Sequence, residues 1–298
     1  MSDIRPDEYW AKKGDVDLFM FRKRLTTSNN APVLFLVHGS SFSGQTAFDL
    51  QVPGRDDYSL MDRFAEAGFD VWALDHEGYG RSSRTDGNSD IASGVADLKA
   101  EFDLVTRETG ATTALFYGSS SGALRAAAFA EARPEAVTRL VLDAFVWTGK
   151  DAPTLIKRAE NLEYFRTHNT RPVDRAFFES IFTRDKPGTS EQIVTETLAK
   201  TELQYGDMVP TGTYLDMCAN LPVVDPTKIT CPVMIVRGEH DGVATEEDLM
   251  NFFRLLPNMD KQFTVFAGQA HVTPLGLNRR RFWHAMEAFL TLPDRLDK

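Results

Sequence analysis

Hydrophobic residues in this chain gather in short runs that recur between longer amphipathic segments. Apolar, β-branched runs of about four to eight residues are typical of strands buried in a parallel sheet. Helical patterns lie between most of the runs, and this alternation indicates a mainly parallel sheet covered by helices on both faces. The runs occupy residues 33–37, 70–74, 113–117, 139–143, 232–236 and 262–266.

Two regions depart from this rhythm. Residues 9–25 alternate in part between apolar and polar side chains, which predicts one or two antiparallel strands at the edge of the sheet. The interval between Asp143 and Cys231 is far too long for one crossover helix, and it holds three helical patterns, at 155–165, 173–182 and 190–203. We therefore expect an inserted helical segment and divide the chain into 1–146, 147–224 and 225–298.

A glycine-flanked serine motif lies at the middle of the chain. Gly118-Ser119-Ser120-Ser121-Gly122 stands between the apolar run 113–117 and the alanine-rich helical stretch 123–132. Glycines at both ends of a strand-turn-helix allow a sharp bend that pushes the central serine out with its hydroxyl exposed. Ser120 is therefore the candidate nucleophile.

A serine hydroxyl needs a neighbouring base and a third group that orients the base. Asp241 comes shortly after the apolar run 232–236, and His271 comes after the next run, ahead of a final amphipathic helix. Both positions are suited to the loops at strand ends. Asp143 also follows a strand and remains an alternative to Asp241 as the acid, with Glu239 as a further candidate.

These residues, in this order, resemble the α/β-hydrolase superfamily, in particular its serine-nucleophile members with a helical cap. His38-Gly39-Ser40-Ser41 after the run 33–37 is similar to the family's oxyanion loop, and the loop 75–82 is similar to its next strand-end loop. The resemblance extends over about residues 31–290. It implies an eight-stranded, mainly parallel sheet with helices on both faces and a helical cap over residues 147–224.

The resemblance also implies roles for the rest of the site. Backbone N–H groups of Ser121 and of Ser40, or its neighbour Ser41, would hold the charge that builds on a substrate oxygen. His38 would brace their loop through hydrogen bonds. No metal or organic cofactor is expected. The side chains expected to bind substrate are Ser41, Trp147, Tyr164 and Tyr214.

Composition limits the classes of partner that this chain is expected to bind. The chain has 33 basic and 43 acidic residues, a net charge of −10, whereas nucleic-acid-binding proteins concentrate positive charge. The start lacks an apolar signal-peptide core, and no apolar run reaches the roughly 18 residues of a membrane span. We expect a cytoplasmic protein with no nucleic-acid or membrane partner, a homodimer being left open. Cys218 and Cys231 are expected to be free thiols.

The function implied is that of a serine hydrolase. It would cleave a small or medium acyl compound, such as an ester, lactone, amide, carbamate or thioester, through an acyl-enzyme. Two alternatives remain: a carbon–carbon bond hydrolase on the same fold, and a ligand-binding, receptor-like protein that retains the three residues. Haloalkane dehalogenase chemistry is disfavoured because those relatives carry aspartate where this chain has Ser120.

Overall fold

Eight strands form one sheet at the centre of the molecule. The structure is a computed structural model, and it describes residues 3–27, 30–293 and 296. The strand order is β1-β2-β4-β3-β5-β6-β9-β10; β2 pairs antiparallel with both β1 and β4, and the other pairs are parallel. The predicted fold class is confirmed. The strands are β1 (Ile4–Lys13), β2 (Val16–Leu25), β3 (Val33–Val37), β4 (Asp70–Leu74), β5 (Ala114–Ser119), β6 (Val137–Asp143), β9 (Val233–Gly238) and β10 (Lys261–Phe266).

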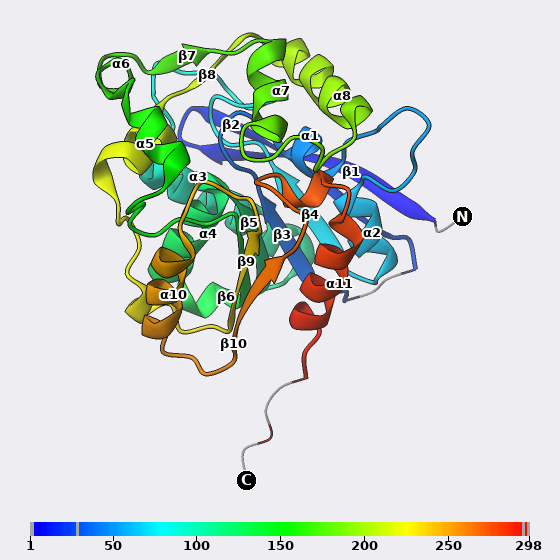
Figure 1. The fold of residues 1–298 in the computed structure, drawn as a ribbon. Helices are drawn as coiled ribbons and strands as arrows, with labels where there is room; N and C mark the ends of the chain where they lie inside the picture. The colour runs from blue at the N-terminus through cyan, green and yellow to red at the C-terminus, as the bar shows by residue number, and fades with distance from the viewer. Residues whose placement is uncertain (1–2, 28–29, 294–295, 297–298) are drawn as a thin grey trace.

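Helices cover both faces of this sheet (Figure 1). Successive side chains of a strand point to opposite faces, so along β3 Phe35 joins one hydrophobic cluster and Leu36 joins the other. The first cluster packs under α3 (Ile91–Thr109), α4 (Ser121–Ala132) and α10 (Glu246–Leu255). The second packs under α1 (Gly44–Phe48), α2 (Leu60–Glu66) and α11 (Arg279–Leu290).

The segment between β6 and β9 is inserted at the carboxyl ends of the parallel strands. The helical pattern expected over 155–165 is divided into α5 (Pro153–Ala159) and α6 (Leu162–Thr167). The other helices are α7 (Arg175–Thr183), α8 (Gln192–Glu202) and α9 (Gly212–Leu215), the last followed by a π-helical turn at Asp216–Asn220. Short 3₁₀ turns lie at Pro134–Ala136, Leu203–Tyr205, Pro226–Lys228 and Thr273–Leu275.

A small antiparallel pair, β7 (Thr170–Pro172) with β8 (Met208–Pro210), joins two distant parts of the inserted segment, as Figure 1 shows along its upper rim. The sequence did not predict this pair, because runs of three residues carry no readable alternation. Cys218 and Cys231 are free, as expected. Among the described residues, no helix combines the length and the apolarity that crossing a bilayer requires.

Candidate active site

Ser120 occupies a strained turn between β5 and α4. Its backbone has φ 57° and ψ −125°, a conformation that residues other than glycine rarely adopt. The flanking glycines are required by close packing. A Cβ on Gly122 would lie 2.2 Å from the Val37 carbonyl oxygen, and one on Gly118 would lie 2.5 Å from the Gly122 carbonyl oxygen. The strain therefore presents the Ser120 side chain at the carboxyl end of β5.

The loops after β9 and β10 bring an aspartate and a histidine to this serine. His271 Nε2 lies 3.1 Å from Ser120 Oγ, and His271 Nδ1 lies 2.9 Å from Asp241 Oδ1. Asp241 also accepts the Val243 N–H at 3.0 Å. Burial alone would raise the pKa of Asp241, but the charge and hydrogen bond of His271, with the Val243 N–H, hold that pKa below its ordinary value. The carboxylate is thus kept ionised beside the imidazole.

The two other acidic candidates have different partners. Asp143 is completely buried and accepts a hydrogen bond of 2.8 Å from the Tyr117 hydroxyl. Burial raises the pKa of Asp143 to about 8, which favours its neutral form. Glu239 accepts the Gly268 N–H at 2.8 Å. Of the three carboxyl groups, the one hydrogen-bonded to His271 is that of Asp241.

Hydroxyl groups join the loop after β3 to the serine turn. Ser40 Oγ lies 2.8 Å from Ser121 Oγ and 2.6 Å from Thr213 Oγ1, which comes from α9 of the inserted segment. Ser121 is the first residue of α4, where backbone N–H groups have no partner within the helix. Gly39 closes the arrangement, since a Cβ there would lie 2.9 Å from Ser120 Cβ. Hydroxyl groups of the loop after β3, of α4 and of α9 therefore meet next to the serine turn.

Two buried histidines support the same loop. His38 Nδ1 is 2.7 Å from the Gly39 carbonyl oxygen, and His38 Nε2 accepts the His76 N–H at 3.0 Å. His76 Nδ1 in turn lies 3.1 Å from an oxygen of Asp97. Burial holds the pKa of both imidazoles well below the ordinary value, so each is neutral. His38 therefore braces the loop, as the sequence indicated.

A small cavity opens beside Ser120 and His271, with a volume of about 40 Å³. Apart from the polar groups already named, its wall is apolar and consists of Phe42, Ala47, Phe48, Ile181, Val272 and Pro274.

The aromatic residues expected to bind substrate lie in different places. The Trp147 indole donates to the Val224 carbonyl oxygen at 3.2 Å and faces a separate hollow of about 440 Å³. The Tyr164 ring stacks on His168, with ring centroids 4.1 Å apart. Neither residue lines the cavity at Ser120. Their role in substrate binding stays a prediction.

Tyr214 and Ser41 are also absent from the lining of that cavity, and they meet two arginines of the inserted segment. The Arg158 and Arg171 guanidinium groups lie 3.7 Å and 4.0 Å from the centroid of the Tyr214 ring, and Arg171 donates to Ser41 Oγ. Burial would raise the pKa of Tyr214, but the positive charges of Arg171, Arg158 and Arg184 lower it to about 7. Sequence reasoning missed these arginines, because no spacing in the chain relates them to the serine motif.

A second acidic residue, Asp185, lies near the histidine. Possible ligand atoms of Asp185, Asp241 and His271 lie within 4.8 Å of one another. A metal ion there would have to take the atoms that bond His271 to Asp241, whose separation of 2.9 Å is that of a direct hydrogen bond. The arrangement therefore suits proton transfer better than metal binding.

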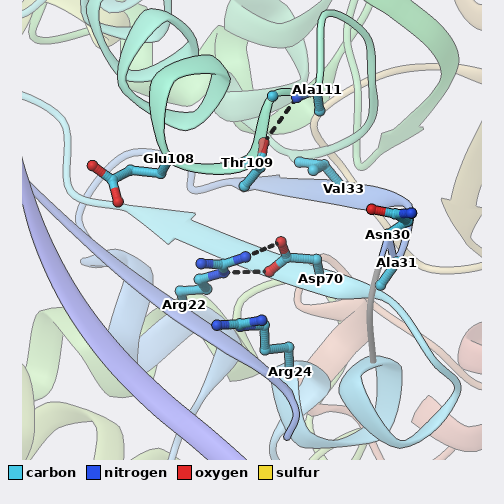
Figure 2. A pocket seen from close by; sticks show the side chains of 10 residues that line it. Arg22, Arg24, Asn30, Ala31, Val33, Asp70, Glu108, Thr109 and Ala111 are labelled. Atoms are coloured by element: carbon cyan, nitrogen blue, oxygen red, sulfur yellow. Dashed lines mark hydrogen bonds and ion pairs between the residues drawn. The ribbon is translucent and has the colours of Figure 1, made fainter. Parts of the chain in front are cut away.

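A larger hollow, of about 410 Å³, lies at the opposite end of the sheet (Figure 2). Val33 and Asp70, the first residues of β3 and β4, line it together with Arg22 and Glu108. Arg22 binds Asp70 through two hydrogen bonds of 2.6 Å and 2.5 Å, which Figure 2 shows as a fork. This end of the sheet lies away from Ser120, and its Arg22 and Asp70 form an ion pair.

The sheet, the glycine-flanked turn and the serine, histidine and aspartate at the strand ends together define an α/β hydrolase. A family model described as "Serine aminopeptidase, S33" matches residues 54–275, well over half of the chain, and the chain belongs to this hydrolase family. No curated protein sequence matches the chain.

Solved structures with this fold match nearly the full length. E-2-(acetamidomethylene)succinate hydrolase is 18% identical with a TM-score of 0.71, covering 96% of this chain and 99% of that one. The carboxylesterase CesB from Bacillus subtilis is 18% identical with a TM-score of 0.70, covering 97% and 93%. The enol-lactonase from Burkholderia xenovorans LB400 is 16% identical with a TM-score of 0.65, covering 95% and 100%. Identities this low show a shared fold alone.

Proposed function

We propose that this hydrolase cleaves a small or medium acyl compound through a covalent acyl-enzyme formed on Ser120. The observation that carries the proposal is the unbroken chain of hydrogen bonds from Ser120 Oγ through His271 to Asp241, at 3.1 Å and 2.9 Å. These distances are within the range in which a base can take a proton from a nucleophile.

In the first half of the reaction, His271 Nε2 accepts the hydroxyl proton while Ser120 Oγ attacks the acyl carbon. Asp241 keeps the proton of the neutral imidazole on Nδ1 and stabilises the imidazolium that forms. The imidazolium then gives its proton to the leaving group, and the bond between the acyl carbon and the leaving group breaks. Ser120 is left as the acyl ester.

Negative charge builds on the former carbonyl oxygen during the attack. Backbone N–H groups of Ser121 and Ser40 are the donors that we propose for it, with Ser41 as the alternative to Ser40. The Ser40 hydroxyl, held by Ser121 and Thr213, fixes the position of its loop. In the second half, His271 activates a water molecule that attacks the acyl-enzyme and releases the acid.

The walls of the site favour a small-molecule substrate. The apolar side chains around the cavity suit the carbon chain of an acyl group, and Ile181 of the inserted segment is one of them. We therefore propose that residues 147–224 act as a cap that shapes the substrate pocket. A carboxylesterase and an enol-lactonase share the fold, so esters and lactones are the first substrates to test.

The test is hydrolysis of a panel by the purified full-length chain. The panel holds p-nitrophenyl esters of increasing acyl length, aliphatic lactones, anilides and vinylogous diketones. We expect turnover of esters or lactones, and a covalent acyl adduct on Ser120 in rapid-quench mass spectrometry. Cleavage of the diketones alone would favour the carbon–carbon hydrolase. Saturable binding without turnover of any compound would favour the receptor-like alternative.

A further inference from the structure

Two guanidinium groups of the inserted segment surround one tyrosine ring. Arg158 comes from α5 and Arg171 from β7, and both guanidinium carbons lie within 4.0 Å of the Tyr214 centroid. Their separation is therefore below the Debye length of about 8 Å in physiological salt, so their charges repel each other with little screening. A protein keeps two cations together at a cost in free energy unless an anion joins them.

Within the described part of the chain, neither arginine forms an ion pair with a carboxylate. Arg158 donates to Met217 Sδ at 3.7 Å, and Arg171 donates to Ser41 Oγ. Arg171 is only 5% exposed, and its Nε has no hydrogen-bond partner. Arg184, the third cation near Tyr214, has Asp185 at 3.5 Å. A buried guanidinium usually has a hydrogen-bonded partner for its charge. Near neutral pH the Tyr214 phenol, whose pKa is about 7, is ionised only in part. A carboxylate from outside the chain would supply the remaining negative charge.

This cationic cluster, defined as Arg158, Arg171 and Tyr214, adjoins the site of the proposed reaction. Arg171 contacts Ser41, which follows Ser40 in the loop beside the nucleophile. Thr213, the neighbour of Tyr214, contacts Ser40 itself at 2.6 Å. The cluster is therefore joined by direct contacts to the loop that flanks Ser120.

We propose that the substrate carries a carboxylate besides its reactive acyl group, and that Arg158 and Arg171 bind this carboxylate. Arginine is suited to the role because its planar N–H groups match the two oxygens of a carboxylate. The substrate class is then a monoester, lactone or amide of a dicarboxylic acid. This proposal rests on the proposed hydrolytic function and specifies which class of substrate the hydrolase prefers.

The first experiment compares matched esters. Mono-p-nitrophenyl esters of glutarate, adipate and suberate carry a free carboxylate. The matched compounds are the same p-nitrophenyl esters with that carboxylate converted to a methyl ester, which removes the charge. We expect kcat/KM of the wild type to favour the free carboxylate by about 10- to 100-fold for at least one chain length. In Arg171→Met and in Arg158→Met this ratio should fall toward one.

Arg175→Met is the matched control. Arg175 lies on α7 and pairs with Glu179 and Glu196 at the surface, so its loss should leave the ratio unchanged. Arg171→Lys keeps the charge without the planar fork and should restore part of the ratio. A ratio near one in the wild type, or a ratio that neither arginine substitution changes, would overturn the proposal.

The second experiment needs no turnover. Adipate should bind to Ser120→Ala in isothermal titration calorimetry, whereas adipamide of the same length should bind at least about tenfold more weakly. Adipate should also reduce the tyrosinate absorbance of wild type near neutral pH, because a carboxylate between the arginines opposes ionisation of Tyr214, with Tyr214→Phe as the blank.

The two experiments separate the two proposals. Adipate binding without hydrolysis of any ester would sink the hydrolytic function and leave the anion site standing. Ester hydrolysis with no preference for free-carboxylate esters, and with adipate binding no tighter than adipamide, would support the hydrolytic function and overturn the anion site.

Discussion

Arginines lie against aromatic rings at both ends of this sheet, but the two arginines have different polar partners. At the amino ends of the strands, Arg22 lies 4.8 Å from the Trp72 ring and forks onto Asp70. At the carboxyl ends, Arg171 lies 4.0 Å from the Tyr214 ring, and its polar contact is a serine hydroxyl. The comparison teaches that stacking alone does not identify a binding site. Arg22 has a carboxylate partner, whereas Arg171 has none among the residues that the structure describes.

The origin of the partners explains the difference. β2 and β4 are neighbours in the sheet, and their register sets Arg22 directly opposite Trp72, with Asp70 two residues away on the same strand. The pair is thus completed by the sheet itself. Arg171 of β7 instead meets Ser41 in the loop after β3, and the two residues are 130 positions apart in sequence. A guanidinium held in this way can keep its charge available for a ligand.

The largest expected effect on catalysis comes from removing the Ser120 hydroxyl at the carboxyl ends of the strands. Ser120→Ala should lower kcat by about 10⁶-fold with the fold intact, because it removes the nucleophile of a cooperating set. Ser119→Ala is the matched control and should retain turnover. A fluorophosphonate probe followed by peptide mapping should label Ser120. Labelling of Ser119 or Ser121, or unchanged turnover of the alanine variant, would move the nucleophile elsewhere.

The next effect compares the two buried carboxyl groups near the site. Asp241→Asn should lower kcat by up to about 10⁴-fold, because the amide favours the wrong tautomer of His271. Asp143→Asn should have a much smaller effect, since Asp143 contacts Tyr117 instead. Steady-state kinetics of both variants decide the matter. The reverse ranking would assign the acid to Asp143.

The third prediction concerns the paired end of the sheet. Arg22→Met should lower the free energy of unfolding by about 3–5 kcal/mol, because it leaves the Asp70 carboxylate buried without its partner. The side chains are 8% and 5% exposed, so water screens the pair little. Urea titration measures the loss, and Arg22→Met with Asp70→Val should recover most of it. If Arg22→Met altered the ratio of kcat/KM for free-carboxylate and methyl esters, the contrast between the two ends would fail.

The smallest effect is a pH dependence of stability. The pKa of Asp143 is about 8 in the folded protein and near its ordinary 3.8 in the unfolded chain. Between these values the folded state holds a proton that the unfolded state has released, so stability falls as the pH rises from about 4 to about 8. The Asp143→Asn variant carries an amide that cannot ionise, and it avoids this loss.

The measurement for this prediction is thermal unfolding of wild type and Asp143→Asn at low salt. The Tm of the variant relative to wild type should be higher at about pH 8 than at about pH 5, by about 2 °C or more. An equal difference at both pH values would show that Asp143 does not hold its proton in the folded protein.

Features that depend on neighbours in sequence could be predicted from the sequence. The apolar runs predicted the strands because a buried strand needs a short continuous run, and both faces of this sheet are covered. The serine turn could be recognised because its glycines, strand and helix are adjacent in the chain. The same local logic placed Asp241 and His271 after successive strands. Parallel strands then bring their carboxyl ends to one edge of the sheet, where these residues meet Ser120.

Only the tertiary structure decided which distant groups meet. The sequence left Asp143 and Asp241 as alternatives because both follow strands, and the hydrogen bond to His271 involves Asp241. It gave no sign of the cationic cluster either, since Arg158, Arg171 and Tyr214 come from separate elements of the inserted segment. Hydrophobic periodicity reports which face of an element is buried, but the choice of partners across the core depends on packing between elements. That packing places Arg158 and Arg171 beside Tyr214, and Arg171 beside Ser41.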